Sequence, residues 1–277
     1  AHNLTPTIYT MAGVEAAADA VAEQHHRPLP VHVKVDTGMH RVGAAPRSML
    51  AIVRAIHEYA GLEIEGLYTH FAAADVLDDP FTAVQAQRFH QVVDELRGEG
   101  LLPPVLHCSN SAAAIRFPEL RFSMVRCGIA LYGIQPSEDV PLLTGMTTAM
   151  SVRAHVSCVG HVEAGETISY GRHYQVDRPT RIATVPLGYA DGVPRRLADT
   201  GEVLIHGRRR KIAGSVTMDQ LMVDCGDDET IAVGDEVVLF GRQGDEEISA
   251  DEWAERTGTL AYEIVCRIGP RLPRRYC

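Results

Sequence analysis

Apolar residues in the first half of the chain alternate between short runs typical of strands and spacings typical of helices. The stretch Val31-His-Val-Lys-Val-Asp36 is an apolar run with polar interruptions, as in a strand of a covered parallel sheet. Apolar residues at helical spacing follow it. The pattern predicts strands at residues 7–10, 31–36, 64–70, 105–108 and 124–132, and helices at 12–25, 46–60, 80–98 and after Ser111.

Strands that alternate with helices indicate a parallel sheet or a (β/α) barrel. These units make about five, whereas a full barrel has about eight in roughly 250 residues. Either the sheet is open, or its first units lie upstream of residue 1. We therefore predict the C-terminal part of a (β/α)8-type barrel, N-terminally incomplete, over residues 1–145.

The pattern changes near residue 145, where apolar and polar residues begin to alternate and glycine-rich breaks separate the runs. This is typical of half-buried strands. Residues 146–277 are predicted to form a mostly antiparallel β-domain with one helix near 250–258, capped by Ser249. Its expected strands lie within 149–162 and at 181–186, 202–206, 211–217, 221–224 and 236–240.

Composition narrows the function classes. A net charge of −10 argues against a nucleic-acid surface. The six cysteines form no C-x-x-C pair, so neither a zinc site nor another metal site is expected. No apolar run is long enough to cross a membrane. Only Lys34 and Lys211 are lysines, which leaves two candidates for a Schiff-base residue.

Polar residues follow the predicted barrel strands where each strand ends, which is the reactive face of this fold. They are Lys34 with Arg41, His70, Asn110 with Ser111, and Arg126 with Gly128. Each alone is more typical of a structural role, and a Ser after Asn is typical of a helix cap. Together they predict a cationic and hydroxylic floor for a phosphate-bearing ligand, with Ser111, the amides of Gly128 and Ile129 and a helix N-terminus at the phosphate.

Tyr170 ends the stretch Glu166-Thr-Ile-Ser-Tyr-Gly171 in the β-domain. A strand-end tyrosine is commonly half buried with a solvated hydroxyl. The alternative is a catalytic proton donor and acceptor delivered to a cofactor site in the other half of the protein.

Eight motifs in the same order resemble alanine racemase along essentially the whole chain. They are His32-Val-Lys-Val-Asp-Thr-Gly-Met-His-Arg41, Gly66-Leu-Tyr-Thr-His70, His107-Cys-Ser-Asn-Ser111, Val125-Arg-Cys-Gly-Ile-Ala-Leu-Tyr-Gly133, Ile168-Ser-Tyr170, Val185-Pro-Leu-Gly-Tyr-Ala-Asp-Gly192, Val216-Thr-Met-Asp-Gln220 and Tyr262-Glu-Ile-Val-Cys-Arg267.

The resemblance implies a pyridoxal 5′-phosphate enzyme that interconverts L- and D-alanine by two-base proton transfer on the cofactor aldimine. It implies a head-to-tail homodimer in which Tyr170 of one subunit completes the site of the other. Tyr170 matches the base for L-alanine, and a chain through His70 to Arg126 would favour its phenolate. Arg126 also matches the residue facing the pyridine nitrogen, which its guanidinium leaves unprotonated.

Further site residues are implied by the same resemblance. They are a phosphate set (Ser111, Gly128, Ile129 and Tyr262), substrate-side residues (Arg41, Met218 and Asp219), a lysine that is carbamylated in many members (Lys34), and a narrow access corridor (Tyr189, Arg195 and Asp75). The implied role is supply of D-alanine for peptidoglycan in a bacterial cytoplasm.

One part of the resemblance is absent. Nothing here resembles the first barrel strand that carries the Schiff-base lysine, and we expect about a hundred further residues upstream. The alternatives are an inactive or degenerate fragment, a broad-specificity racemase, and a related barrel decarboxylase of basic amino acids. The tyrosine motif argues against the decarboxylase.

Overall fold

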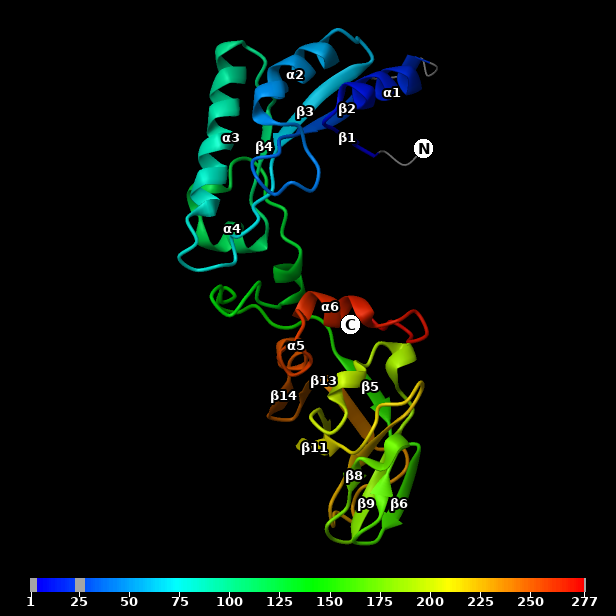
Figure 1. Ribbon diagram of the computed structural model, residues 1–277. Helices are drawn as coiled ribbons and strands as arrows, with labels where there is room; N and C mark the ends of the chain where they lie inside the picture. The colour runs from blue at the N-terminus through cyan, green and yellow to red at the C-terminus, as the bar shows by residue number, and fades with distance from the viewer. Residues whose placement is uncertain (1–3, 23–27, 277) are drawn as a thin grey trace. The chain divides into compact units, whose positions relative to one another are not determined.

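The computed structural model describes residues 4–22 and 28–276. The chain divides into two compact units, residues 1–146 and 147–277, which are called the N-terminal and C-terminal units below (Figure 1). The end of the predicted helix 12–25 lies outside the described residues.

The N-terminal unit is built on a four-stranded parallel sheet in the order β1-β2-β3-β4. Each strand is followed in the chain by a helix, so the predicted alternation is confirmed (Figure 1). The strands are β1 (Thr7–Ile8), β2 (Leu29–Lys34), β3 (Leu62–Tyr68) and β4 (Val105–His107), and the helices are α1 (Met11–Ala22), α2 (Met49–His57), α3 (Phe81–Gly98) and α4 (Ser111–Arg116).

Alternation along β2 explains how this sheet is covered. Val31, Val33 and Val35 are fully buried, because successive side chains of a strand point to opposite faces and these three share one face. Helix α3 buries Phe89, Val92, Val93 and Leu96, which lie three or four residues apart and so form one apolar stripe.

The predicted strand at 124–132 is wrong. Residues 124–128 have no regular structure, and residues Ile129–Tyr132 form a 3₁₀ turn. The backbone N–H of Arg126 bonds to the carbonyl of Ser109 at 2.9 Å, and the side chain of Arg126 reaches inward. The apolar run therefore supplies buried residues, Ile129 and Ala130, without pairing as a strand.

The C-terminal unit contains an eight-stranded sheet in the order β14-β13-β10-β11-β12-β9-β6, with β5 also paired to β13. All its pairs are antiparallel, as predicted. The strands are β5 (Val152–His155), β6 (Cys158–Val162), β9 (Thr180–Val185), β10 (Glu202–Ile205), β11 (Arg208–Ile212), β12 (Leu221–Asp224), β13 (Glu236–Gln243) and β14 (Glu246–Ile248). A separate hairpin joins β7 (Thr167–Ile168) to β8 (Tyr174–Gln175).

One local prediction for this unit needs correction, and one helix was missed. The predicted strand 211–217 ends at Ile212, because Ala213 to Thr217 run as a loop in which Gly214 has a φ of 74°. The predicted helix is confirmed as α5 (Ala250–Thr257), with the hydroxyl of Ser249 accepting from the N–H of Glu252 at 3.0 Å. A second helix, α6 (Ala261–Arg267), was not predicted.

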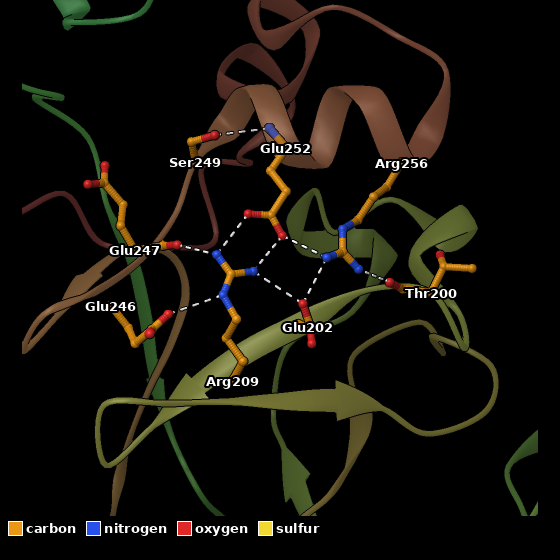
Figure 2. Close-up of polar contacts among 8 residues, drawn as sticks. All are labelled: Thr200, Glu202, Arg209, Glu246, Glu247, Ser249, Glu252 and Arg256. Carbon is orange, nitrogen blue, oxygen red and sulfur yellow. Dashed lines mark hydrogen bonds and ion pairs between the residues drawn. The ribbon is translucent and has the colours of Figure 1, made fainter.

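An ion cluster centred on Arg209 links β10, β11, β14 and α5 (Figure 2). Arg209 donates to Glu202 and Glu246 at 3.2 Å and to Glu252 at 2.7 Å. Arg256 donates to Glu202 and Glu252, each at 2.8 Å. Hydrogen bonding to Glu252 raises the pKa of Arg209 above its usual value.

We expect Arg209→Met to lower the free energy of unfolding by about 1–3 kcal/mol, because three carboxylates lose a shared charged donor. The matched control is Arg97→Met. The side chains of Arg97 and Asp94 are 59% and 69% exposed, against 33% and 22% for Arg209 and Glu252, so the control should cost at most about 0.5 kcal/mol. Urea denaturation measures both, and equal losses would contradict a structural role for the cluster.

Candidate active site

Three side chains form a row across the parallel sheet of the N-terminal unit. Lys34, Tyr68 and His107 stand in register on β2, β3 and β4. The rings of Tyr68 and His107 stack, with centroids 4.5 Å apart and planes 11° from parallel. The row lies where the strands end, which is the edge at which barrel enzymes collect their reactive groups.

Arg126 lies against this row and is held by several acceptors. Its Nη1 is 2.6 Å from Nδ1 of His107. Its Nη2 bonds to the carbonyl of Thr69 at 2.8 Å and lies 3.2 Å from Nδ1 of His70. Nη2 also bonds to the carbonyl of Cys108 at 3.3 Å. The guanidinium plane is therefore fixed from several sides.

These contacts determine the tautomers of the neighbouring imidazoles. A guanidinium only donates hydrogen bonds, so Nδ1 of both His107 and His70 accepts and Nε2 carries the proton. Nε2 of His107 then donates to Nδ1 of His32 at 2.8 Å. His32 in turn donates through Nε2 to Glu65 at 3.3 Å. A directed chain thus runs from Arg126 to the carboxylate of Glu65.

Burial and charge keep the two inner imidazoles neutral. Burial, followed by the positive charges of Arg126, Arg41 and Lys34, lowers the pKa of His70 to about 4. Burial and the neighbouring Arg126 lower the pKa of His107 to about 3. Both values agree with the acceptor roles that the hydrogen bonds assign to Nδ1.

His107 should make the stability of the protein depend on pH. An unfolded histidine titrates near pH 6.5, whereas the folded ring titrates near pH 3. Between these values only the unfolded chain binds the proton, so the free energy of unfolding falls as pH falls, by up to about 1.4 kcal/mol per pH unit. Urea denaturation at several pH values between about 6 and 5 gives the free energy of unfolding as a function of pH. This free energy should depend less steeply on pH for His107→Gln than for the wild type. Equal slopes would contradict this account.

The interpretation of the sequence did not identify roles for His107, His32, Tyr68 and Glu65. The signal available was alternation, since His32 and Lys34 lie two apart on β2 and share a face. Gly66 was a second signal. A Cβ at Gly66 would lie 2.6 Å from the His32 ring, so any residue other than glycine would collide with the ring in this position.

Lys34 and Arg41 belong to the same charged group. Lys34 is 5% exposed. Burial lowers the pKa of Lys34, and the positive charges of Arg41 and Arg126 lower it further. The segment with Arg41 follows β2 and is shaped by Asp36, whose carboxylate accepts from the N–H groups of Gly38 and His40, each at 3.0 Å.

Ser111 and the loop after Arg126 form a cradle of amide and hydroxyl groups. The hydroxyl of Ser111 accepts from the N–H of Gly128 at 2.9 Å and, more weakly, from that of Ala130 at 3.4 Å. Space beside Gly128 is open, since a Cβ there would meet nothing within 4 Å. Asp75 lies on a different loop, where its carbonyl accepts from the hydroxyl of Ser137 at 2.6 Å.

A hollow of about 900 Å³ lies within the C-terminal unit. It brings together five of the residues predicted from sequence: Tyr170, Tyr189, Arg195, Met218 and Asp219. Residues that the sequence interpretation did not assign complete the lining: Gly192, Val193, Ser215, Val216, Thr217 and Arg267. Tyr262 lies on α6, the helix that also carries Arg267.

Close backbone packing forms one wall of this hollow. The N–H of Tyr189 bonds to the carbonyl of Thr217 at 3.0 Å, and the N–H of Ala190 bonds to that of Met218 at 2.8 Å. A Cβ at Gly188 would lie 2.3 Å from the Thr217 carbonyl. Only glycine therefore allows these two segments to approach so closely.

Among residues 4–22 and 28–276, no three His, Cys, Asp or Glu side chains gather in a way that could hold a metal ion. In the same part of the chain, no helix combines the length and apolar character that crossing a bilayer requires.

Family models cover nearly the whole chain. The N-terminal domain model of alanine racemase matches residues 1–136, and the C-terminal domain model matches residues 149–276. An alanine racemase of Symbiobacterium thermophilum is 46% identical over 246 residues, covering 89% of this chain and 65% of the relative. One of Halothermothrix orenii is 42% identical over 278 residues, covering 99% of this chain and 72% of the relative. The chain thus spans about two thirds of the first relative's length.

Solved structures of alanine racemases also resemble this chain. The alanine racemase of Streptomyces coelicolor A3(2) has a TM-score of 0.94 at 38% identity, with 99% of this chain and 73% of that one covered. That of Bacillus anthracis with bound L-Ala-P has a TM-score of 0.89 at 37% identity, covering 98% and 70%. The predicted fold class, a (β/α) barrel-type unit followed by an antiparallel β-domain, is confirmed. The chain belongs to the alanine racemase family.

Proposed function

We propose that the protein of which this chain is a part is an alanine racemase that uses pyridoxal 5′-phosphate. Membership of the family supports the proposal. The observation that carries it is Arg126, a permanent cation held by His107, His70 and two carbonyls at the strand ends. In this proposal Arg126 faces the pyridine nitrogen of the cofactor, and that nitrogen would stay unprotonated because a guanidinium does not give up a proton.

The residues present fit the cofactor. The hydroxyl of Ser111 and the amides of Gly128 and Ile129 would hold its phosphate, for which the space beside Gly128 is open. The Gly128 N–H would then exchange its bond to the Ser111 hydroxyl for one to a phosphate oxygen. Tyr262 is proposed as a further phosphate ligand. When bound, pyridoxal phosphate supplies an electron sink that makes the Cα proton of alanine removable.

Tyr170 of the partner subunit is the proposed base for L-alanine in a head-to-tail homodimer. A free tyrosine has a pKa near 10 and is a poor base at neutral pH. His70 accepts from Arg126 at Nδ1, so its Nε2–H is free to donate to the phenolate, which favours the charged form. The neutral state of His70, whose pKa is lowered to about 4, keeps this donor in place at working pH.

The other predicted site residues are proposed to bind the substrate, to support the residues that bind it, or to line its access. Arg41 would bind the alanine carboxylate, and the Met218 amide and Asp219 would close the substrate side. Buried Lys34, with its lowered pKa, holds its amine in the uncharged form more readily and would react with carbon dioxide to give a carbamate and a proton. Tyr189, Arg195 and Asp75 would form the corridor. The biological role is D-alanine supply for peptidoglycan in a bacterial cytoplasm.

Incubation of the full-length protein with pyridoxal phosphate and L-alanine, followed by chiral chromatography, tests the proposal. D-Alanine should form, and equal amounts of both enantiomers should accumulate. Comparable rates with L-serine or L-lysine would indicate a broad-specificity racemase. Carbon dioxide release without any D-amino acid would indicate a decarboxylase. No reaction with any of these substrates would contradict the proposed function.

A further inference from the structure

The turn that carries Tyr170 has an unusual backbone. It consists of residues 169–173 and is closed by the pair Ile168 and Tyr174 of the β7–β8 hairpin. Within five residues, Ser169, Gly171 and Arg172 have φ values of 65°, 78° and 54°. Positive φ is uncommon for residues other than glycine, so contacts outside the turn must hold this conformation.

One set of contacts comes from the loop after β11. The hydroxyl of Ser169 donates to the carbonyl of Ser215 at 2.9 Å, and the hydroxyl of Ser215 donates to the carbonyl of Tyr170 at 3.0 Å. These two bonds fasten the backbone on both sides of the Tyr170 Cα. Tyr170 itself remains 77% exposed.

The second set fixes the closing pair. Ile168 is buried in an apolar cluster with Val176, Ile182 and Ala213. Opposite it, the hydroxyl of Tyr174 donates to the Oδ2 atom of Asp224 at 2.7 Å. Asp224 ends β12, a strand in the interior of the large sheet. The hairpin is therefore anchored to a strand that is paired with a neighbour on both sides.

Both carboxylate oxygens of Asp224 accept hydrogen bonds. Its Oδ1 atom accepts from the hydroxyl of Thr180 at 2.5 Å and from the N–H of Gly226 at 2.9 Å. Burial opposes ionisation, but the bonds from Thr180, Tyr174 and Gly226 outweigh it and lower the pKa of Asp224. Burial and the bond to Asp224 raise the pKa of Tyr174. The pair thus remains phenol and carboxylate at any working pH.

We propose that Tyr174 and Asp224 are positioning residues for Tyr170. Their hydrogen bond fixes the closing pair of the turn and so sets the direction in which the Tyr170 phenol projects. Neither residue is among those that line the hollow. This inference rests on the proposed function, in which Tyr170 moves the Cα proton of L-alanine and a different base serves D-alanine.

Primary deuterium isotope effects test this role. The full-length holoenzyme and its Tyr174→Phe variant are compared with [2-²H]-L-alanine and [2-²H]-D-alanine. Misplacement of Tyr170 raises the barrier of the one proton transfer that uses it. We expect kcat/KM to fall roughly tenfold, the effect of losing a hydrogen bond to a charged acceptor. The isotope effect for L-alanine should rise relative to that for D-alanine.

Asp224→Asn keeps a hydrogen-bonding group of the same shape and should retain most of the wild-type behaviour, whereas Asp224→Ala should resemble Tyr174→Phe. Thr257→Val is the control, because it deletes a buried hydroxyl that donates to the Trp253 carbonyl at 2.6 Å on α5. It should leave the ratio of isotope effects unchanged. If Tyr174→Phe fails to fold, Thr180→Val is used instead, because it removes the hydrogen bond from Thr180 to the Oδ1 atom of Asp224. This variant should shift the ratio of isotope effects in the same direction by a smaller amount.

A merely structural role would lower the rates in both directions and leave the ratio of isotope effects as in the wild type, which would overturn the inference. Failure of the wild type to racemise alanine would instead contradict the proposed function. The two failures are therefore distinguishable.

Discussion

Tyr170→Phe should lower the rate of alanine racemisation by roughly 10²–10⁴-fold, the contribution typical of a general acid–base group. The variant removes one oxygen from a residue that is 77% exposed, so the fold loses little. The phosphate cradle at Ser111 and Gly128 belongs to the N-terminal unit and is unchanged. Affinity for pyridoxal phosphate should therefore stay at the wild-type value while kcat collapses.

The measurement pairs a chiral assay of alanine with a spectroscopic titration of the cofactor. Tyr59→Phe is the matched control, because Tyr59 is also an exposed tyrosine and follows α2 in the N-terminal unit. It should racemise alanine at the wild-type rate. Retention of full activity by Tyr170→Phe would show that another group moves the proton of L-alanine.

Arg126→Lys should lower racemisation by about 10–100-fold, from the loss of several fixed hydrogen bonds. An ammonium cannot reach His107, His70 and the Thr69 carbonyl together in the manner of a planar guanidinium. Lysine also gives up its proton more readily than arginine. With lysine at this position the pyridine nitrogen of the bound cofactor would be able to take up a proton, so transamination to pyruvate should increase relative to racemisation.

Pyruvate is measured with coupled lactate dehydrogenase, and D-alanine is measured by chiral chromatography on the same samples. Arg97→Lys serves as the control, because the pair of Arg97 with Asp94 is exposed. Its ratio of pyruvate to D-alanine should equal that of the wild type. The same ratio in Arg126→Lys would contradict the role given to the guanidinium.

Regular elements of this chain could be predicted where local pattern and local chemistry agree. The alternation at Val31 and Val33 identified a covered strand, and Ser249 marked the start of α5. The prediction for 124–132 failed because apolar residues such as Ile129 are buried from a 3₁₀ turn as well as from a strand. Helix α6 was missed because its seven residues give too short a period to detect.

The site was less predictable, since its contacts depend on register and on distant segments. Lys34, Tyr68 and His107 lie side by side only because β2, β3 and β4 pair in one register. The chain from His107 through His32 to Glu65 follows from that pairing.

The hollow in the C-terminal unit joins Tyr170, Tyr189 and Met218, which are far apart in the sequence. Their convergence depends on sheet topology that local pattern does not contain. The resemblance to the family named these residues, but Ser215 and Arg267, which lie in or beside its motifs, were not assigned to the site.

Racemisation of L-alanine in deuterium oxide by the full-length holoenzyme tests the central claim most directly. Tyr170 should remove the Cα proton of L-alanine, and a second base that has exchanged with solvent should deliver deuterium to the opposite face. The D-alanine product should therefore carry deuterium while the remaining L-alanine stays largely unlabelled at early times. Mass spectrometry after chiral separation gives both values. Formation of deuterated D-alanine supports the account. D-Alanine that retains the original hydrogen, or no D-alanine at all, would contradict it.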